Sequence, residues 1–248
     1  MGKVALITGG AKGIGAAICR ELAGKGFDVV INYLTSEAKA NSLANELSKK
    51  YGVKALTIKC DISQENEVDE MVKIIENQMH GVDVLINNAA IDLSNMWHEK
   101  KALDFQKTLD VNVLGAYNVA RRVYKHMLDN KWGRIINISS TNGINTYYPM
   151  CLEYDASKAA LISLTHNLSI EFAPYITVNA VAPGFIGTES ELEGYDPEFL
   201  KSEQEKILVG RYGKPEEVAK LVGFLVSDDA AYINNSVIRI DGGQYGSN

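Results

Sequence analysis

The stretch TGGAKGIG, Thr8–Gly15, follows the first short apolar run of the chain and precedes the amphipathic segment Ala16–Leu22. Glycines at such a strand-to-helix turn let the backbone curl tightly and approach a ligand closely. Free N–H groups at the start of the following helix then hold a negatively charged group such as a pyrophosphate. The spacing, Gly-x-x-x-Gly-x-Gly, is a variant of the Gly-x-Gly-x-x-Gly pattern of dinucleotide-binding turns. We therefore expect a dinucleotide here; glycines that serve only the geometry of the turn are the alternative.

Outward from this turn, short β-branched apolar runs alternate with segments of helical spacing along the chain. The runs lack apolar/polar alternation, as expected of strands covered by helices on both faces. Seven strands are predicted, at Lys3–Thr8, Phe27–Asn32, Val53–Cys60, Val82–Asn87, Arg134–Ser139, Ile176–Val181 and Val237–Ile240. Helices are predicted at Ile14–Gly24, Glu37–Tyr51, Glu65–Met79, Ala102–Asn130, Ala156–Phe172 and Glu216–Val226. This order predicts an α/β fold, a single-domain Rossmann-like doubly wound parallel sheet with helices on both faces.

The length of 248 residues allows one large domain or two. No linker, charge block or internal repeat divides the series, so residues 1–248 are expected to form one dinucleotide-binding and catalytic domain. Residues 184–213 break the rhythm, because they combine several glycines with the long polar stretch Glu189–Gln204. We expect this segment to be a mobile lid over a substrate site, with a solvated surface helix between two loops as the alternative.

The charge balance and the cysteines exclude several classes of protein. With 25 basic and 31 acidic residues, the net charge of −6 gives no general attraction to nucleic acid or to an anionic membrane. The widely separated Cys19, Cys60 and Cys151 form no Cys-x-x-Cys pair, which is typical of buried thiols in a reducing compartment. No signal-type apolar segment and no run near the roughly 20 residues of a membrane span are present. We expect a cytoplasmic protein without a metal site.

The end of the second predicted strand bears on the choice between the two nicotinamide dinucleotides. A carboxylate about 20 residues after the glycines would bind the ribose 2′-hydroxyl of NAD. The strand instead ends in Asn32 and Tyr33, without a carboxylate. Lys12 in the turn, together with Thr35 and Ser36, could bind a 2′-phosphate. NADP is therefore preferred, with NAD as the alternative.

Tyr154 and Lys158 stand four residues apart near the start of a predicted helix, so their side chains share one helix face. Reduction of a carbonyl by hydride leaves an alkoxide that must be protonated, and a carboxylic acid of pKa about 4 is already ionised at neutral pH. A phenol with an ordinary pKa of about 10 keeps its proton, and a nearby cation lowers that pKa toward the working pH. The pair alone is a weak signal. Ser140 strengthens it, because it follows the fifth strand at the edge where ligands of open α/β sheets bind.

With these motifs in this order, the sequence resembles the short-chain dehydrogenase/reductase family over nearly its whole length. The stretches that carry the resemblance are Thr8–Gly15, Asp61, Asn87-Asn88-Ala89-Ala90, Asn112, Ser140, Tyr154 with Lys158, Pro183-Gly184 through Thr188, and Asp241-Gly242-Gly243. The resemblance implies that Tyr154 is the general acid/base. It implies that Lys158 lowers the pKa of this tyrosine and holds the nicotinamide ribose, that Ser140 polarises the carbonyl, and that Asn112 holds a water linking Lys158 to solvent.

The resemblance also implies the residues that contact the cofactor. Asp61 would cap the adenine ring, whereas Ile186 and Thr188 would contact the nicotinamide carboxamide. The complete expected set is Gly9, Lys12, Gly13, Ile14, Gly15, Asn32, Tyr33, Ser36, Asp61, Ile62, Asn88, Ala89, Ala90, Tyr154, Lys158, Pro183, Gly184, Ile186 and Thr188.

Two features depart from the family pattern. Ala90 stands where the pattern Asn-Asn-Ala-Gly has glycine, which adds a methyl group near the cofactor. Ser140 lies 14 residues before Tyr154, one more than the common spacing, so Ser139 is the alternative to Ser140 as the catalytic serine.

Within the family, the chain looks closest to 3-oxoacyl-acyl carrier protein reductases of fatty acid biosynthesis, which implies reduction of a 3-oxoacyl thioester to a secondary alcohol. The resemblance also implies a homotetramer, joined through the helices at Ala102–Asn130 and Ala156–Phe172 and through the C-terminal strand. Tyr147, Tyr148, Met150 and Leu152 are expected to line a partly apolar substrate pocket.

The charges leave the substrate open. An arginine that the family uses to attract the acidic carrier is missing just before the sixth strand, where the chain reads Ala173-Pro174-Tyr175. Lys131 could still supply a charge near the other docking position of the carrier. The expected lid carries acidic residues that would repel such a carrier, namely Glu189, Glu191, Glu193, Asp196 and Glu198. An NAD(P)-dependent dehydrogenase of a sugar, polyol or other small alcohol is therefore the alternative, and a non-catalytic dinucleotide-sensing regulator is a remote one.

Overall fold

The computed structural model describes residues 2–245, apart from the side chains of residues 190 and 191. Seven strands form one parallel sheet in the order β3-β2-β1-β4-β5-β6-β7. They are β1 (Val4–Ile7), β2 (Asp28–Tyr33), β3 (Ala55–Lys59), β4 (Val84–Asn87), β5 (Gly133–Ile138), β6 (Ile176–Pro183) and β7 (Val237–Ile240). The strand order reverses beside β1, where ligands of such sheets bind. The predicted doubly wound sheet is confirmed.

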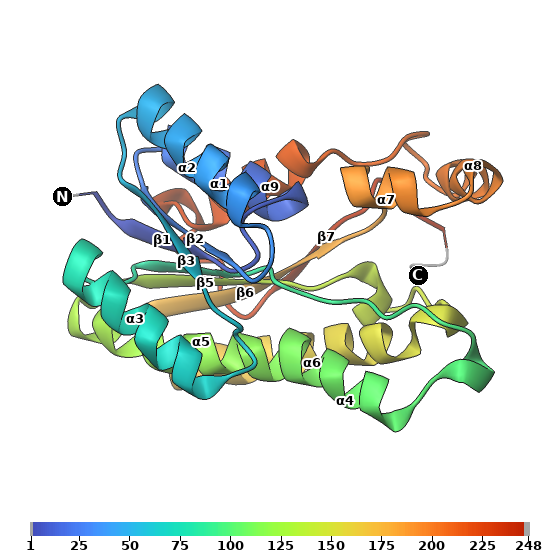
Figure 1. The fold of residues 1–248 in the computed structure, drawn as a ribbon, viewed down its shortest axis with the longest axis horizontal. Helices are drawn as coiled ribbons and strands as arrows, with labels where there is room; N and C mark the ends of the chain where they lie inside the picture. The colour runs from blue at the N-terminus through green and yellow to red at the C-terminus, as the bar shows by residue number, and fades with distance from the viewer. Residues whose placement is uncertain (1, 246–248) are drawn as a thin grey trace.

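Two layers of helices cover the sheet (Figure 1). The helices on one face are α1 (Gly13–Gly24), α2 (Glu37–Tyr51) and α9 (Pro215–Leu225), and those on the other are α3 (Glu65–Met79), α5 (Gly115–Asp129) and α6 (Leu152–Glu171). Each layer of helices packs against the sheet and buries its own apolar core, around Ile18 and Val222 on the first face and around Ile75 and Val119 on the second. Because both faces are buried, the strands need no polar side, which explains their unbroken apolar runs.

The prediction of one continuous helix at Ala102–Asn130 is wrong, because the helical segment is interrupted. The structure has α4 (Ala102–Leu109), a π-helical turn at Asp110–Leu114 and then α5. The turn contains Asn112, whose buried amide is bonded to other segments. Single-turn π segments occur often at functional sites, and apolar spacing does not reveal them.

Helix α6 begins at Leu152, four residues before the predicted start at Ala156, so Tyr154 lies in its first turn. A buried ion pair accompanies this extra turn, since the carboxylate of Glu153 lies 2.6 Å from Lys100 Nζ. Glu153 is 1% exposed, and a buried carboxylate requires such a partner. The lysine comes from a distant part of the chain, so the spacing of the sequence could not show it.

Residues 184–213 contain α7 (Glu189–Gly194) and α8 (Pro197–Glu205), which project beyond the carboxyl-terminal edge of the sheet (Figure 1). Asp196 caps α8 by accepting a hydrogen bond of 2.8 Å from the Glu198 N–H. Aromatic rings hold the segment together, with centroids 5.0 to 6.3 Å apart among Phe185, Tyr195, Phe199 and Tyr212. The segment therefore lies where a lid would lie, and its movement stays a prediction.

The glycine turn before α1 leaves no room for a side chain at Gly9 or Gly15. Gly9 has a φ of +61°, a conformation that favours glycine. A Cβ placed on Gly15 would lie 2.5 Å from the Gly9 carbonyl oxygen and 2.7 Å from Asn88 Nδ2. The close approach of α1 to the turn therefore requires glycine at position 15.

We predict that Gly15→Ala lowers the free energy of unfolding by about 1–3 kcal/mol, because the new methyl group must displace backbone. Thermal unfolding without cofactor measures this as a Tm lower by several degrees. Gly24→Ala in the same helix is the matched control, since its Cβ would make an ordinary contact 3.5 Å from the Tyr51 ring. Equal Tm values for the two variants would contradict the packing argument.

Candidate active site

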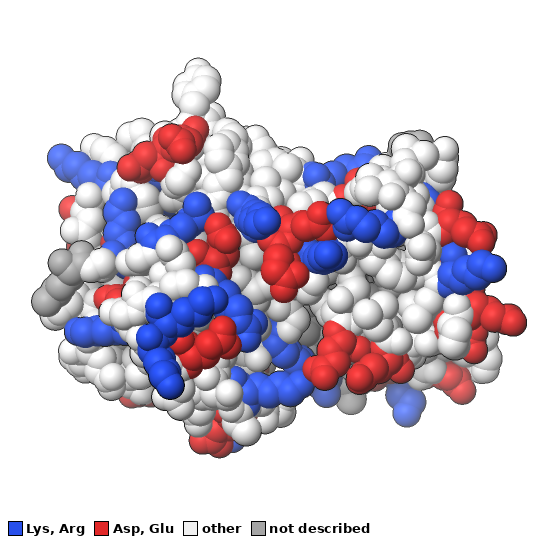
Figure 2. Space-filling model, turned by 90° about the horizontal axis from the view of Figure 1, so that it is seen from above, with Lys and Arg blue, Asp and Glu red and all other residues white. Residues whose placement is uncertain are grey.

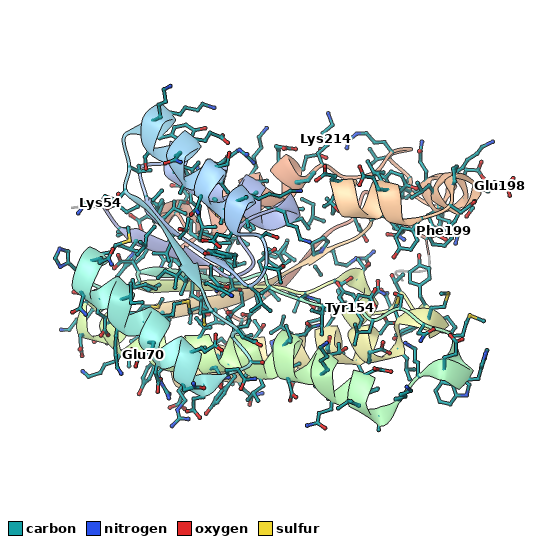
Figure 3. The ribbon with its side chains drawn as sticks, in the orientation of Figure 1. Lys54, Glu70, Tyr154, Glu198, Phe199 and Lys214 are labelled. Atoms are coloured by element: carbon teal, nitrogen blue, oxygen red, sulfur yellow. The ribbon has the colours of Figure 1, made fainter. Side chains whose placement is uncertain are left out.

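A cavity of about 520 Å³ opens at the carboxyl-terminal edge of the sheet, beneath the segment that contains α7 and α8. Figure 3 shows Tyr154 on the side of α6 that faces these two helices. The cavity brings together eleven of the predicted site residues, namely Lys12, Ile14, Asn88, Ala90, Ser140, Tyr154, Lys158, Pro183, Gly184, Ile186 and Thr188. Residues from five separate parts of the chain therefore meet in one pocket.

The remaining predicted residues lie outside the lining of this cavity. They are Gly9, Gly13 and Gly15 in the turn, Asn32, Tyr33 and Ser36 around the end of β2, Asp61 and Ile62 after β3, Ala89 after β4, and Asn112 in the π turn. Five of these residues, Asn32, Tyr33, Ser36, Asp61 and Ile62, lie around the ends of β2 and β3, on one side of β1 in the sheet.

Lys158 is a buried cation beside the ring of Tyr154. Its side chain is 2% exposed, and Nζ lies 5.3 Å from the centroid of that ring. Nζ donates a hydrogen bond of 2.8 Å to the carbonyl oxygen of Ile138, the last residue of β5. Burial lowers the pKa of Lys158 to about 8, so the ammonium is still mostly charged at neutral pH.

The two serines after β5 have different partners. Ser139 Oγ donates a hydrogen bond of 2.9 Å to the carbonyl oxygen of Lys158, which ties β5 to α6. Ser140 Oγ is bonded to its own loop, where it accepts a 3.2 Å hydrogen bond from the Asn142 N–H and donates one of 3.3 Å to Asn142 Oδ1. This geometry favours Ser140 over Ser139 as the hydroxyl that meets a substrate.

Asn112 is 2% exposed, and its side-chain amide connects two segments next to the cavity. Nδ2 donates to the Ile91 carbonyl oxygen at 2.9 Å and to Ser157 Oγ at 3.0 Å, while Oδ1 accepts from the Ile91 N–H at 2.8 Å. Both amide hydrogens are thus used within the protein. Ser157 directly precedes Lys158, so Asn112 supports the stretch of α6 that carries the lysine.

Two asparagines hold the glycine turn from opposite sides. Asn88 Nδ2 donates to the carbonyl oxygens of Thr8 and Gly9, at 2.9 and 3.1 Å. Asn32 Oδ1 accepts from the Gly9 N–H at 3.2 Å, and its Nδ2 donates to the Cys60 carbonyl oxygen at 3.0 Å. The amide of Asn32 therefore supports the turn instead of pointing to a ligand. Sequence reasoning missed this role, although a buried amide at the end of an apolar strand is a signal for it.

The side chain of Ile62 packs inside the protein. It is 4% exposed, and its side chain packs where a Cβ on Gly115 would lie, at 2.7 Å. The side chain thus belongs to the contact between the end of β3 and the start of α5. Asp61 uses Oδ1 to accept from the N–H and the hydroxyl of Ser63, at 3.0 and 2.7 Å.

The turn and α1 fit the phosphate end of a dinucleotide. Lys12 is the N-cap residue of α1, and its side chain makes no capping hydrogen bond. The N–H groups of the first turn have no partner within their own helix, which favours an anion there. Lys12 is exposed beside them and can approach a phosphate. The residues present therefore fit a nicotinamide dinucleotide.

Further charges surround this end of the site. Lys39 Nζ, on α2, lies 3.0 Å from the carboxylate of Glu189 on α7. The Lys39 hydrogen bond and the nearby charge of Lys12 lower the pKa of Glu189. Burial and a hydrogen bond to the Glu37 carboxylate raise the pKa of Tyr33. The carboxylate of Glu37, at the start of α2, thus lies near the end of β2.

The residues expected around the substrate divide into two groups. Tyr148 and Met150 line the cavity, together with Phe185, Tyr195 and Phe199 from residues 184–213, which we call the lid segment. Tyr147 is 71% exposed, and Leu152 lines a different cavity, so these two expectations are wrong.

The acidic residues of the lid segment are mostly exposed, as predicted. This applies to Glu189, Glu193, Asp196 and Glu198, whereas the side chain of Glu191 is outside the described part. Figure 2 shows both acidic and basic side chains at the end of the molecule where α8 lies. Repulsion of an acidic carrier protein at this end would therefore come from local groups of carboxylates and not from one continuous acidic surface.

The described residues contain neither a metal-binding cluster nor a membrane-spanning helix. They contain no cluster of three or more His, Cys, Asp or Glu side chains that could hold a metal. None of their helices has the length and apolar character needed to cross a membrane.

Comparisons with known proteins agree with this site. Residues 9–244 match the family model described as enoyl-(acyl carrier protein) reductase. A 3-oxoacyl-[acyl-carrier-protein] reductase from Aquifex aeolicus is 39% identical over 246 residues, which cover 98% of each chain. The chain is also similar to two solved structures.

The first is a short-chain dehydrogenase/reductase mutant from Serratia marcescens, with a TM-score of 0.91, 34% identity and 98% of each chain covered. The second is a gluconate 5-dehydrogenase from Burkholderia cenocepacia in complex with NADP and tartrate. Its TM-score is 0.90 at 32% identity, and the match covers 98% of this chain and 94% of that one. The fold, the motif residues gathered in one cavity and these full-length similarities identify the chain as a member of the short-chain dehydrogenase/reductase family.

Proposed function

We propose that this chain reduces the ketone of a 3-oxoacyl thioester, carried by an acyl carrier protein, to a secondary alcohol, with NADPH as the reductant. The observation that carries the proposal is the cavity in which Ser140, Tyr154 and the buried Lys158 meet at the edge of the sheet. The name of the similar Aquifex aeolicus protein supports the oxoacyl substrate.

The three side chains have complementary tasks in this reaction. A bound nicotinamide dinucleotide supplies the hydride for the carbonyl carbon. The Ser140 hydroxyl donates a hydrogen bond to the carbonyl oxygen and orients it. The Tyr154 hydroxyl gives its proton to that oxygen as the alcohol forms, and the charge of Lys158 stabilises the phenolate that remains.

The buried lysine suits this task because its environment is poor in competing charges. Desolvation strengthens the attraction between an ammonium and a nearby phenolate, since the effective dielectric constant is low. Asn112 acts as a positioning residue that holds Ser157, and the water-mediated return of a proton to Lys158 stays a prediction from the family. Ser139 has the same supporting character, through its bond to the Lys158 carbonyl oxygen.

The predicted cofactor contacts fit two ends of one dinucleotide. The glycine turn and Lys12 would hold the phosphates, and Asp61 with Ala89 would lie toward adenosine. Ile186 and Thr188 would lie toward nicotinamide, and Thr188 contacts the turn from the lid segment, 3.5 Å from a Cβ placed on Gly13. NADP is preferred because Lys12 offers a cation to the 2′-phosphate, and the solved relative with NADP supports this choice.

A second candidate is an NAD(P)-dependent dehydrogenase of a sugar, a polyol or another small alcohol. The exposed carboxylates of α7 and α8 favour it, because they would repel an acidic carrier at the mouth of the cavity. The similarity to a gluconate 5-dehydrogenase supports the same alternative.

The assembly and the mobility of the lid are also proposals. Exposed apolar side chains on the helices expected to join a homotetramer support that assembly, among them Leu103 on α4, Tyr117 on α5 and Ile170 on α6. The position of residues 184–213 over the cavity supports their role as a substrate lid.

The substrate is tested by following absorbance at 340 nm with NADPH or NADH and three classes of compound. We expect reduction of acetoacetyl thioesters with NADPH, no reduction of crotonyl thioesters, and weak turnover of sugars and polyols in the reverse direction with NADP⁺. The crotonyl arm separates ketone reduction from the enoyl reduction named by the family model. Faster turnover of a polyol than of any thioester would favour the second candidate.

We also predict that Lys12→Ala weakens the binding of NADPH by about tenfold and that of NADH much less, because one charge-assisted hydrogen bond to the 2′-phosphate is lost. Titration of each cofactor against intrinsic fluorescence gives the two Kd values. Lys54→Ala, at an exposed lysine far from the turn, is the control (Figure 3). An equal loss for NADPH and NADH would remove the argument for a contact with the 2′-phosphate.

A further inference from the structure

One contact that holds helix α8 against the cavity is made by a buried acidic side chain. Among its residues, all of which the structure describes, Glu203 alone is buried, and it is 2% exposed. The other acidic residues nearby point to solvent, as Glu198 does in Figure 3. Burial of a carboxylate is unfavourable unless it is paired and hydrogen-bonded, so the contacts of Glu203 decide whether this helix can lie here.

Both carboxylate oxygens of Glu203 have partners. Oε2 accepts a hydrogen bond of 2.6 Å from the hydroxyl of Tyr148, and Oε1 lies 2.6 Å from Lys206 Nζ. A hydroxyl bonded to an ionised acceptor makes one of the stronger hydrogen bonds in proteins. Burial and the Glu203 carboxylate both raise the pKa of Tyr148, so this tyrosine keeps its proton and remains a donor.

The bond between Tyr148 and Glu203 joins two opposite walls of the cavity. Tyr148 lies on the loop between Ser140 and Tyr154 and lines the cavity. Phe199 lines the same cavity from α8, on the side that faces Tyr154 in Figure 3. This contact therefore links α8 to the loop beside the reacting groups, in addition to the aromatic contacts of Phe199 and the hydrogen bond from the Tyr212 hydroxyl to the Leu200 carbonyl oxygen.

The loop that carries Tyr148 is itself held in place. The Tyr148 N–H donates to Asp155 Oδ2 at 3.2 Å, at the start of α6. On the far side of the loop, the Asn95 N–H donates to the Met150 carbonyl oxygen at 3.1 Å. Because the loop cannot easily follow a moving lid, loss of the bond to Glu203 would release α8 and not the loop.

A closed lid limits the room for a substrate. The cavity of about 520 Å³ is lined both by residues proposed to meet nicotinamide, such as Ile186 and Thr188, and by residues around the substrate. Its volume is within the range of pockets that hold small ligands, and part of it would be filled by the cofactor. What remains suits a short acyl group better than a long one.

We propose that Tyr148 and Glu203 determine the substrate size of this enzyme, as a clamp that holds α8 closed and restricts the ketone substrate to short acyl chains. The inference rests on the proposed reduction of oxoacyl thioesters and adds its specificity. Tyr148 and Glu203 are positioning residues, because they act through the place of α8 and not on the reacting atoms.

The test compares kcat/KM for acetoacetyl and 3-oxodecanoyl thioesters of N-acetylcysteamine in the full-length protein. We expect the wild type to prefer the short substrate. In Tyr148→Phe, the ratio of long-chain to short-chain kcat/KM should rise by about tenfold, because the change removes the charge-assisted bond to Glu203. In Glu203→Gln the ratio should rise at least as much, because the bond from Tyr148 and the ion pair with Lys206 both lose the charge of the carboxylate. The double variant should equal Glu203→Gln, since Tyr148 acts on α8 through its bond to Glu203.

Tyr147→Phe is the matched control, because the adjacent Tyr147 is exposed and donates its hydroxyl to the Ile144 carbonyl oxygen. Its ratio should equal that of the wild type. An unchanged ratio in Tyr148→Phe, or an equal loss of kcat/KM for both thioesters, would overturn the clamp.

Amide hydrogen exchange separates this proposal from the proposed function. In the unliganded full-length protein, residues 197–205 should exchange faster in Tyr148→Phe than in Tyr147→Phe, while the strands keep their protection. If the wild type reduces neither thioester, the proposed function fails, and unchanged exchange in α8 would then reject the clamp on its own.

Discussion

The hydrogen bonds from the side chain of Asn88 to the carbonyl oxygens of Thr8 and Gly9 join the end of β4 to the glycine turn at the point where the strand order reverses. Asn32 completes this arrangement from β2, since it accepts from the Gly9 N–H. The buried amide of Asn32 and the partly buried amide of Asn88 therefore hold the turn in a conformation that aims the N-terminus of α1 at the mouth of the site. The absence of a Cβ at Gly15 lets the helix approach closely enough for this geometry.

The opposite wall of the site depends on a second set of buried polar contacts. Lys158 Nζ bonds to the Ile138 carbonyl oxygen, and Ser139 bonds back to the Lys158 carbonyl oxygen, so β5 and α6 are linked in both directions. This linkage places a cation beside Tyr154 and leaves Ser140 at the cavity. The same polar contacts that complete the fold at this edge thus arrange the groups proposed to handle the carbonyl oxygen.

The alternation of buried strands with helices was enough to predict the sheet, because period and length depend on local sequence. The spacing of Tyr154 and Lys158 likewise placed them on one helix face. The π turn at Asn112, the supporting role of Asn32 and the pairing of Tyr148 with Glu203 could not be predicted, because each depends on residues that are distant in sequence. The choice between Ser139 and Ser140 needed the same three-dimensional information.

The central claim is that Tyr154 donates the proton that completes reduction of a ketone. The most direct measurement is single-turnover reduction of an acetoacetyl thioester by Tyr154→Phe with saturating NADPH, together with the Kd of NADPH. The account predicts a rate lower by about 10²–10⁴-fold and a Kd close to that of the wild type, because the ring and its packing are kept. Turnover by Tyr154→Phe at the rate of the wild type would contradict it.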